Sequence, residues 1–436
     1  MKSATKSFAG WGRYPTEECR AWRPDKARDV REIAAEYDVL ARGLGRAYGD
    51  AALNPHGLVL TEKLNRFLSF EDGILECEGG ASFADIIETF GPRGWFLPVT
   101  PGTKFVSVGG AIACDVHGKN HHRDGTIAHF LEEFDLLVAS GELLHCSRTE
   151  NAEAFWATIG GMGLTGIITR ARLRLFSVES SAISAKFDRT QNLQETLEAF
   201  DADGGFQYSV AWLDLLASGD NLGRGVLIRG NHATQEEAKP LRVKSKKQKP
   251  VPIDFPDWAL NPLSVRAFNT AYYATHPSGD KLVSWDEFFY PLDGVAGWNK
   301  IYGARGFVQY QCALPHESSR SGLRTLLEKL AESSRPSFLA VLKTFGESDD
   351  APLSFPIAGH TLALDLPMNE STVEFARELD DIVLDCGGRV YLAKDTTLLP
   401  ENLPKMYARL DEWRETKAKL DPNNKFQSSL SRRLKI

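Results

Sequence analysis

The sequence predicts an α+β protein of two domains, and three observations lead to this fold class. The chain has 436 residues, more than one ordinary hydrophobic core organises. Up to about residue 180, short strands and helices surround several glycine clusters. Beyond residue 180, strands alternate with longer helices, a pattern typical of an antiparallel sheet covered by helices. We therefore place a domain boundary near residue 180.

The composition indicates a folded protein and disfavours some classes of partner. Hydrophobic residues make up 42% of the chain and aromatic residues 10%, as in globular proteins. The net charge of −7 argues against a dedicated nucleic-acid binder. The six cysteines are scattered without a CxxC pair, which favours a reduced interior. No apolar run resembles a signal peptide or a membrane span, so we expect a soluble, cytoplasmic protein.

In the first domain, a helix is predicted over residues 25–36. Pro24 and Asp25 mark its start, and Val30, Ile33, Ala34 and Tyr37 then follow on one face. The other elements are predicted from β-branched or aromatic runs bounded by glycine, and from one amphipathic run. They are strands at 57–60, 74–78, 130–139 and 164–176, and a helix at 82–90.

In the second domain, the same patterns predict a sheet and its covering helices. The strands are expected at 207–214, 225–229, 305–314, 338–344 and 361–366, and the helices near 190–200 and at 317–332 and 371–385. Residues 230–285 hold six prolines with little periodicity, so we expect long mobile loops there. A last helix is predicted to begin at Pro404 and to bury Met406, Leu410 and Trp413.

Three glycine-rich segments lie within the first 180 residues. Residues 43–49 resemble a dinucleotide fingerprint, but the third glycine comes one residue late, so this loop alone fits a structural turn equally well. Two more such segments follow at 101–110 and 160–166. Several separated glycine loops suit an extended ligand such as a flavin dinucleotide, and a set of tight turns is the alternative.

Two further clusters admit a functional and a structural interpretation. Cys114, His117, His121 and His122 carry zinc-ligand chemistry, but all four lie within nine residues and no second ligand pair follows, so we predict no metal. The basic run at Arg242, Lys244, Lys246, Lys247 and Lys249 is typical of a solvated loop. The alternative for this run is contact with an anionic lipid surface or a phosphate.

Polar and aromatic side chains recur at the strands of the second domain. Gln309 and Gln311 alternate with Tyr310, so both amides point to one face of a strand. That face could bind a ligand or meet solvent. The other residues of this kind are Tyr290, Trp298, Asn299, Tyr302, Lys343, Tyr391 and Lys394.

At these residues the chain resembles the flavin-dependent oxidoreductases of the vanillyl-alcohol oxidase type, and within them the enzymes that oxidise a lipid-linked ribose. The resemblance runs from about residue 10 to residue 434. The matching text is Gly10-Trp-Gly-Arg13, Ala41-Arg-Gly-Leu-Gly-Arg-Ala-Tyr-Gly-Asp50, Val108-Gly-Gly-Ala-Ile-Ala-Cys-Asp-Val-His-Gly-Lys-Asn-His-His122, Phe155-Trp-Ala-Thr-Ile-Gly-Gly161, Gly163-Leu-Thr-Gly-Ile-Ile168, Pro352-Leu-Ser-Phe-Pro356 and Tyr391-Leu-Ala-Lys-Asp395.

The resemblance implies an FAD-binding domain of the PCMH type over residues 1–180, joined by a C-terminal segment, 389–436. A substrate domain, 181–388, lies between them. Many relatives attach FAD through a histidine where this chain has Arg46, so a non-covalent FAD is expected. The residues implied in FAD binding are Ala41, Arg42, Gly43, Leu44, Gly45, Arg46, Ala47, Tyr48, Gly49, Asp50, Gly102, Thr103, Ser107, Val108, Gly109, Gly110, Cys114, Asp115, Val116, His117, Gly118, Ile168 and Tyr391.

The implied reaction oxidises the 2′-hydroxyl of a polyprenyl-phosphate-linked ribose to a 2′-ketone, the first half of epimerisation to arabinose. Hydride would pass to flavin N5, and Lys394, His117 and Tyr48 are candidates for the base. The implied substrate-binding residues are Lys119, Trp212, Tyr290, Asn299, Gln309, Gln311, Lys343, Thr361, Ala363 and Lys394. Ala363 stands where relatives carry an active-site cysteine, and Thr361 where they carry asparagine.

The implied partners are the lipid-linked sugar phosphate and a short-chain-type NAD(P)H-dependent keto-reductase. Peripheral contact with the inner face of a membrane through the 230–285 loops is a further expectation, and nucleic acid is not expected. Two alternatives stay open. One is an FAD oxidase of a small sugar or aldonolactone, and the other is a non-catalytic protein that binds metal or an anionic surface.

Overall fold

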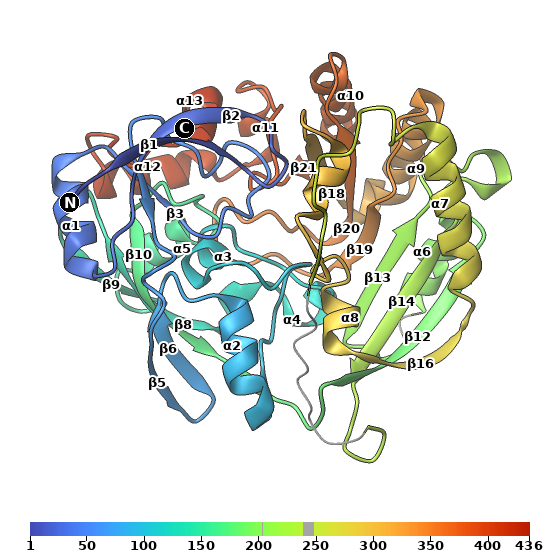
Figure 1. The fold of residues 1–436 in the computed structure, drawn as a ribbon, viewed down its shortest axis with the longest axis horizontal. Helices are drawn as coiled ribbons and strands as arrows, with labels where there is room; N and C mark the ends of the chain where they lie inside the picture. The colour runs from blue at the N-terminus through green and yellow to red at the C-terminus, as the bar shows by residue number, and fades with distance from the viewer. Residues whose placement is uncertain (203, 239–247) are drawn as a thin grey trace.

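The computed structural model describes residues 1–202, 204–238 and 248–436. The N-terminal half contains two larger sheets and the short pair β7 (Trp95–Phe96) and β11 (Phe176–Ser177), and the other half is built on one large sheet (Figure 1). The fold is α+β with two parts, as expected. The chain passes from the strands of the first half to the large sheet between Ser177 and Ala182.

The N-terminal half is organised around two sheets and short helices. The first sheet has the order β1 (Ala4–Ala9), β2 (Thr16–Trp22), β4 (Leu58–Leu60), β3 (Leu40–Arg42). The second has the order β5 (Phe67–Glu71), β6 (Ile74–Glu78), β10 (Ile167–Arg174), β8 (Leu131–Leu137), β9 (Leu143–Ser147). The helices are α1 (Ala27–Glu36), α2 (Phe83–Phe90), α3 (Val108–Ala113), α4 (His121–Asp124) and α5 (Ala152–Thr158). Strands β1 and β2 were not anticipated from the sequence.

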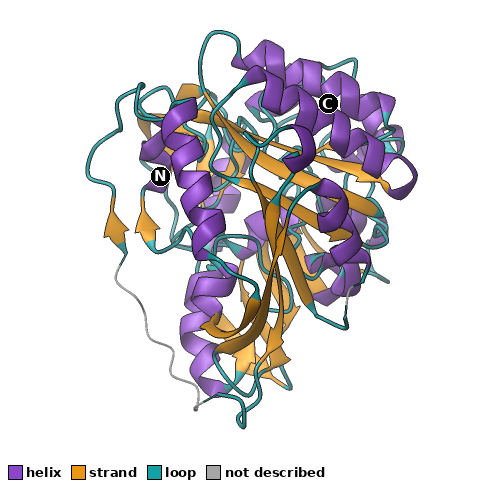
Figure 2. Cartoon of the chain, turned by 90° about the vertical axis from the view of Figure 1, so that its right-hand side faces the viewer, coloured by secondary structure: helices purple, strands orange, loops and turns teal. Residues whose placement is uncertain are grey.

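Eight strands form the large sheet, and all their pairings are antiparallel. Its order is β16 (Gly279–Ser284), β12 (Ala182–Thr190), β14 (Gly225–His232), β13 (Tyr208–Leu213), β19 (Ala340–Phe345), β20 (Gly359–Pro367), β18 (Phe307–Pro315), β21 (Arg389–Val390). Helices α6 (Leu193–Asp201), α9 (His316–Ser333) and α10 (Thr372–Asp385) pack against it. Figure 2 shows this half from its own side, with helices packed along the strands.

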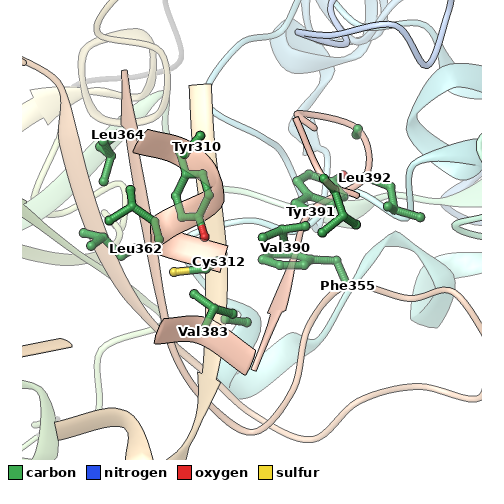
Figure 3. Close-up of a cluster of buried hydrophobic side chains, with 14 of the residues drawn as sticks. Tyr310, Cys312, Phe355, Leu362, Leu364, Val383, Val390, Tyr391 and Leu392 are labelled. Carbon is green, nitrogen blue, oxygen red and sulfur yellow. The ribbon is translucent and has the colours of Figure 1, made fainter. Parts of the chain in front are cut away.

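Side chains alternate between the two faces of this sheet, because successive residues of a strand point to opposite sides. On β18, Tyr310 and Cys312 lie in the core beneath the helices. They pack with Leu362 and Leu364 of β20 and with Val383 of α10 (Figure 3). The intervening residues of the same strands face the N-terminal half. This opposite face is the one that carries the polar side chains described below.

The C-terminal residues return to the N-terminal half, where Figure 1 shows their helices beside β1 and β2. The Trp413 indole Nε1 donates to the backbone oxygen of Ala157 at 2.8 Å. Arg433 forms ion pairs with Asp50 at 2.9 Å and with Asp395 at 2.8 Å. A helix does begin at Leu403, one residue before Pro404, and Met406, Leu410 and Trp413 are buried as predicted, but the prediction of one continuous last helix was wrong. The segment forms α11 (Leu403–Met406), α12 (Leu410–Leu420) and α13 (Ser429–Leu434), because Tyr407 leaves the helical conformation.

The expectation of long loops in 230–285 was wrong for the residues after 261. Residues after 261 form helix α7 (Pro262–Thr275), strand β16 and helix α8 (Trp285–Phe289). Asn261 and Ser264 cap α7 reciprocally, and Pro262 occupies the first helical position, where proline needs no N–H partner. These start signals outweigh the weak apolar periodicity. Four residues of the basic run, Arg242, Lys244, Lys246 and Lys247, lie outside the described residues.

No helix in the described part of the chain combines the length and the apolar content needed to cross a membrane.

Candidate active site

A cavity of about 530 Å³ lies between the glycine loops of the N-terminal half and the polar face of the eight-stranded sheet. Its two walls differ in what they present. The first wall is formed by backbone and small side chains, and we call it the backbone wall. The second is formed by lysine, glutamine and aromatic side chains of the sheet, and we call it the side-chain wall.

The backbone wall centres on the loop of residues 43–47. Within the described part of the chain, none of the five amide N–H groups of this loop has a hydrogen-bond acceptor. A Cβ added to Gly43 would lie 2.1 Å from the Ser107 hydroxyl oxygen, so any other residue here would displace the Ser107 side chain. The Ser107 oxygen in turn accepts the Gly110 N–H at the start of α3. Free N–H groups on a loop that contains glycines, here Gly43 and Gly45, are a usual cradle for phosphate.

Hydrogen bonds on the side away from the cavity fix the backbone of the same loop. Arg42 donates to the backbone oxygens of Ala9 at 2.7 Å and Ala52 at 2.8 Å. The Tyr48 N–H bonds to the Ala393 oxygen at 3.0 Å, which ties the loop to the segment before Lys394. The open N–H groups therefore result from a fixed backbone.

Two buried nitrogens beside this wall lack a hydrogen-bond partner among the described residues. They are Nε of Arg46 and Nδ1 of His117. The Arg46 guanidinium carbon lies 3.9 Å from the ring centre of Trp11, so the cation is positioned by an aromatic face. Buried polar groups are normally paired, and because Arg46 and His117 both line the cavity, a ligand there could accept from these two donors.

On the side-chain wall, Lys394 takes part in a buried hydrogen-bond chain. Lys394 donates to Oε1 of Gln309, and Nε2 of Gln309 donates to Asp365 at 2.6 Å. The Tyr302 hydroxyl donates to the other oxygen of Asp365 at 2.8 Å. Burial lowers the pKa of Lys394 to about 8, and it raises the pKa of Asp365 to about 7. Each group opposes the effect of burial on the other through their opposite charges.

His117 is held by the neighbouring amide. Nε2 of His117 lies 3.1 Å from Nε2 of Gln311, which also donates to the Thr361 hydroxyl at 3.1 Å. Because the amide nitrogen is a donor, the imidazole Nε2 accepts and the proton resides on Nδ1. Burial, with the positive charges of Lys343 and Lys394 nearby, lowers the pKa of His117 well below its usual value. A neutral His117 can therefore donate a hydrogen bond from Nδ1.

Three lysines line the cavity, and burial lowers the pKa of each. Lys119 donates to the Phe289 oxygen at 3.1 Å and has a pKa of about 8. Lys343 lies 3.5 Å from the Gly118 oxygen, and its pKa falls well below the usual value through burial and through repulsion by Lys394 and Lys119. A bound anion would relieve both effects, because it supplies the missing negative charge.

Most of the predicted site residues meet at this cavity. Those that line it are Ala41, Gly43, Leu44, Gly45, Arg46, Ala47, Tyr48, Gly102, Thr103, Ser107, Gly109, Gly110, Cys114, Val116, His117, Gly118, Lys119, Ile168, Trp212, Gln309, Gln311, Lys343, Ala363, Tyr391 and Lys394. Tyr391 also donates to the Cys114 oxygen at 2.6 Å.

Eight predicted residues, all within the described part of the chain, lie behind this lining: Arg42, Gly49, Asp50, Val108, Asp115, Tyr290, Asn299 and Thr361. Several of them support residues that do line it. Tyr290 hydrogen-bonds Thr100 at 2.7 Å, and Asn299 donates to the Trp11 oxygen at 3.0 Å. The buried Asp115 accepts from the Ser354 hydroxyl at 2.6 Å.

The Cys/His cluster is divided among different contacts. His121 accepts the Gly346 N–H at 3.1 Å, and His122 lies 3.4 Å from the Phe206 oxygen. Burial raises the pKa of Cys114 to about 12, so its thiol stays protonated. Among the residues that the structure describes, no three metal-ligating side chains form a group.

Some site residues were missed from the sequence. Asp365 follows Thr361 and Ala363 at two-residue spacing on β20, so a search for polar residues on that face would have found it. Thr100 and the apolar residues of β12, β14 and α7 gave no signal, because apolar strand residues are expected in any core.

FAD fits these residues. The open N–H loop and the glycine at position 43 suit its pyrophosphate, and the small residues of α3 leave room for the rest of the dinucleotide. Opposite them, the amine of Lys394 can take a proton and the other lysines can hold an anion. The arrangement suits oxidation of an anionic alcohol.

Comparison with known proteins gives two family matches. Residues 21–147 match the FAD binding domain family, and residues 304–434 match the D-arabinono-1,4-lactone oxidase family.

Individual relatives agree with these matches. The chain is 38% identical to decaprenylphosphoryl-beta-D-ribose oxidase of Mycolicibacterium smegmatis over 456 aligned positions, covering 100% of this chain and 98% of the relative. It is 22% identical to L-gulono-1,4-lactone dehydrogenase of Mycobacterium tuberculosis over 444 positions, covering 97% and 98%. Cytokinin dehydrogenase 5 of Arabidopsis thaliana matches at 27% over 195 positions, 40% of this chain and 35% of the relative. The chain therefore belongs to the flavin-dependent oxidoreductases of the vanillyl-alcohol oxidase type, and it is an enzyme that uses FAD.

Proposed function

We propose that this enzyme oxidises the 2′-hydroxyl of a polyprenyl-phosphate-linked ribose to a 2′-ketone, the first half of an epimerisation to arabinose. The observation that carries the proposal is the set of three buried lysines, Lys119, Lys343 and Lys394, opposite the FAD cradle. A neutral sugar gives no reason to bury three lysines together, whereas a phosphate would give Lys119 and Lys343 an anionic partner and leave Lys394 free to act as a neutral base. Full-length similarity to decaprenylphosphoryl-beta-D-ribose oxidase supports the same substrate class.

In this proposal each polar residue of the side-chain wall has a separate role. When bound, FAD supplies the acceptor for the hydride that leaves C2′. Lys394 as a neutral amine accepts the hydroxyl proton, and Gln309 fixes the direction of that amine. His117 donates from Nδ1 to a substrate oxygen. Lys119 and Lys343 bind the phosphate, so the two charged contacts orient the sugar for reaction at one carbon.

We also propose that FAD is held without a covalent bond. The loop position from which relatives attach FAD through histidine carries Arg46, whose guanidinium is not a nucleophile at neutral pH. Acid precipitation should therefore leave the flavin in the supernatant. Flavin that stays with the precipitated protein would contradict this assignment.

A second candidate function is oxidation of an aldonolactone or a small sugar. The match of residues 304–434 to the D-arabinono-1,4-lactone oxidase family favours it. The three lysines disfavour it, because a lactone offers no anionic group to them.

Anaerobic bleaching of the flavin separates the two candidates. Purified enzyme is mixed with farnesylphosphoryl-ribose, free ribose, free arabinose and an aldonolactone, and the loss of flavin absorbance is followed. We expect bleaching by the lipid-linked ribose at least about a hundredfold faster than by the neutral compounds, the effect of losing one well-placed phosphate contact or more. Equal rates would overturn the lipid-linked assignment. Colourless protein with stoichiometric zinc would instead support the non-catalytic alternative.

We propose two partners for this reaction. The 2′-ketone needs a hydride donor to become arabinose, and a separate short-chain-type NAD(P)H-dependent reductase would supply it. Peripheral contact with a membrane is the second. It is supported by exposed apolar side chains at Ile253, Phe255, Trp258, Leu263 and Phe268, all close together in the sequence. Sedimentation with lipid vesicles tests this contact, and Trp258→Ser should weaken it.

A further inference from the structure

The cavity extends beyond the lysines along the open face of the eight-stranded sheet. From β18 to β19 this face is polar, with Gln309, Gln311 and Lys343. From β13 to the edge strand β16 it becomes apolar. We call this second part the apolar arm, and its apolar lining residues are Phe187, Val210, Ile228, Tyr272, Val283 and Phe288.

Strand register places the floor of the apolar arm in one row. Ile228 of β14 is directly opposite Phe187 of β12 and Val210 of β13, so three apolar side chains stand side by side on adjacent strands. Phe187 and Val210 are each only 8% exposed. Tyr272 of α7 packs on Trp212 with ring centres 4.5 Å apart and covers this row. His276 and Glu287 are the polar residues of this part of the lining.

Lys119 stands where the apolar arm begins. Its Nζ lies 5.6 Å from the ring centre of Phe288, which belongs to the arm, and 5.6 Å from that of Phe289. The far side of the arm leads to the surface, because Glu287, which lines it, is exposed, and the lining residues His276 and Val283 are half-buried. A buried cation followed by an apolar channel that reaches the surface fits a phosphate esterified to a long apolar chain.

We propose that the apolar arm binds the first isoprene units of the substrate's prenyl chain, while Lys119 binds its phosphate. This assignment rests on the proposed function for the substrate class, but it concerns a separate part of the cavity. The remaining isoprene units of the prenyl chain would extend out of the protein beside α7. The affinity of the enzyme for a prenyl phosphate would thus depend on the length of the prenyl chain, whether or not a sugar is attached.

Binding to the oxidised holoenzyme tests the apolar arm without turnover. Changes in flavin absorbance are followed while inorganic phosphate, dimethylallyl phosphate, geranyl phosphate or farnesyl phosphate is added. We expect affinity to rise about tenfold for each five-carbon unit until the chain is longer than the arm, the gain typical of well-buried ligand atoms. Farnesol should bind more weakly than farnesyl phosphate, because Lys119 then has no anionic partner. Equal affinity for all four phosphates would overturn the proposal.

A matched pair of variants on β16 tests where the prenyl chain binds. Val283 lines the apolar arm, and its neighbour Leu282 points away and is 54% exposed. Val283→Trp should remove the gain with chain length while leaving the affinity for inorganic phosphate unchanged, and Leu282→Trp should behave as wild type. Unchanged binding of farnesyl phosphate by a folded, yellow Val283→Trp enzyme would place the chain elsewhere. The wild-type series decides the proposal even if that variant does not fold. If the series holds but lipid-linked ribose does not bleach the flavin, the proposed function fails and the arm stands.

Discussion

The two walls of the cavity present different kinds of group to a ligand. The backbone wall presents N–H groups from one continuous loop, residues 43–47, in which Gly43 and Gly45 lack Cβ atoms. The side-chain wall presents ammonium and amide groups from alternate positions on β18, β19 and β20 and from the loop at Lys394. A cofactor that never changes can be recognised by backbone, whereas a substrate that differs between relatives is recognised by side chains, which substitutions can alter.

Removal of the proposed base should give the largest effect, and it should affect only the side-chain wall. In Lys394→Ala, substrate-driven flavin reduction should slow by about a hundred- to ten-thousandfold, the contribution usual for general base catalysis. FAD content should be unchanged, since the nearby contact to the backbone wall is made by the Ala393 oxygen. Stopped-flow absorbance measures the reduction rate, and Lys63→Ala, at an exposed lysine, is the control. A Lys394→Ala enzyme with wild-type reduction would exclude Lys394 as the base.

A change confined to the backbone wall should act on FAD instead. In Gly43→Ala the new methyl group would force Ser107 to rotate, because their atoms would be 2.1 Å apart. The rotation releases the Gly110 N–H at the start of α3, and losing such a cap costs about 1 kcal/mol. With the methyl also entering the cavity, the dissociation constant of FAD should rise about tenfold. Equilibrium dialysis measures it, and Gly294→Ala, where an added Cβ meets nothing within 4 Å, should not change it.

The pH dependence tests the electrostatics of the side-chain wall. Lys394 must be neutral to accept a proton, and its pKa is lowered to about 8 by burial. The rate of flavin reduction should therefore rise with pH and level off above about pH 8. The negative charge of Asp365 raises the pKa of Lys394, so Asp365→Asn should lower that pKa and move the midpoint to lower pH. The expected shift is about one unit, as for loss of a nearby charge. Asp381→Asn, at an exposed carboxylate, should leave the midpoint in place, and a shift to higher pH in Asp365→Asn would contradict the argument.

The smallest effect is expected for Ala363, the departure from the relatives on the side-chain wall. Ala363→Cys should change the reduction rate less than about twofold, because a near-isosteric change at a residue without a polar role usually has little effect. The new thiol should be labelled by a maleimide, as read by mass spectrometry. Cys114 should not be labelled, because burial raises its pKa to about 12. Labelling of the wild-type cavity would mean that Cys114 is reactive after all.

Much of the fold could be predicted from local patterns. The helices α1, α9 and α10 and the strands β18, β19 and β20 were found within a few residues, because each carries a strong period of its own. The strands β1 and β2 and the helix α7 were not. β1 is exposed along most of its length and α7 has few buried residues, so neither shows the contrast between buried and exposed positions that periodicity needs.

The sequence by itself determined the cofactor side of this protein. The glycine loop, the segment before His117 and the family to which they point are all continuous in the chain, and a continuous motif needs no folding to be recognised. Only the tertiary structure decided how the side-chain wall is assembled. One hydrogen-bond chain links Asp365, Gln309 and Lys394, which come from three separate segments of the sequence. The apolar arm is formed by a row of residues on adjacent strands, and in the sequence these residues resemble ordinary core residues. Their roles arise from strand pairing and from which face meets the other half, and these depend on contacts between residues far apart in the chain.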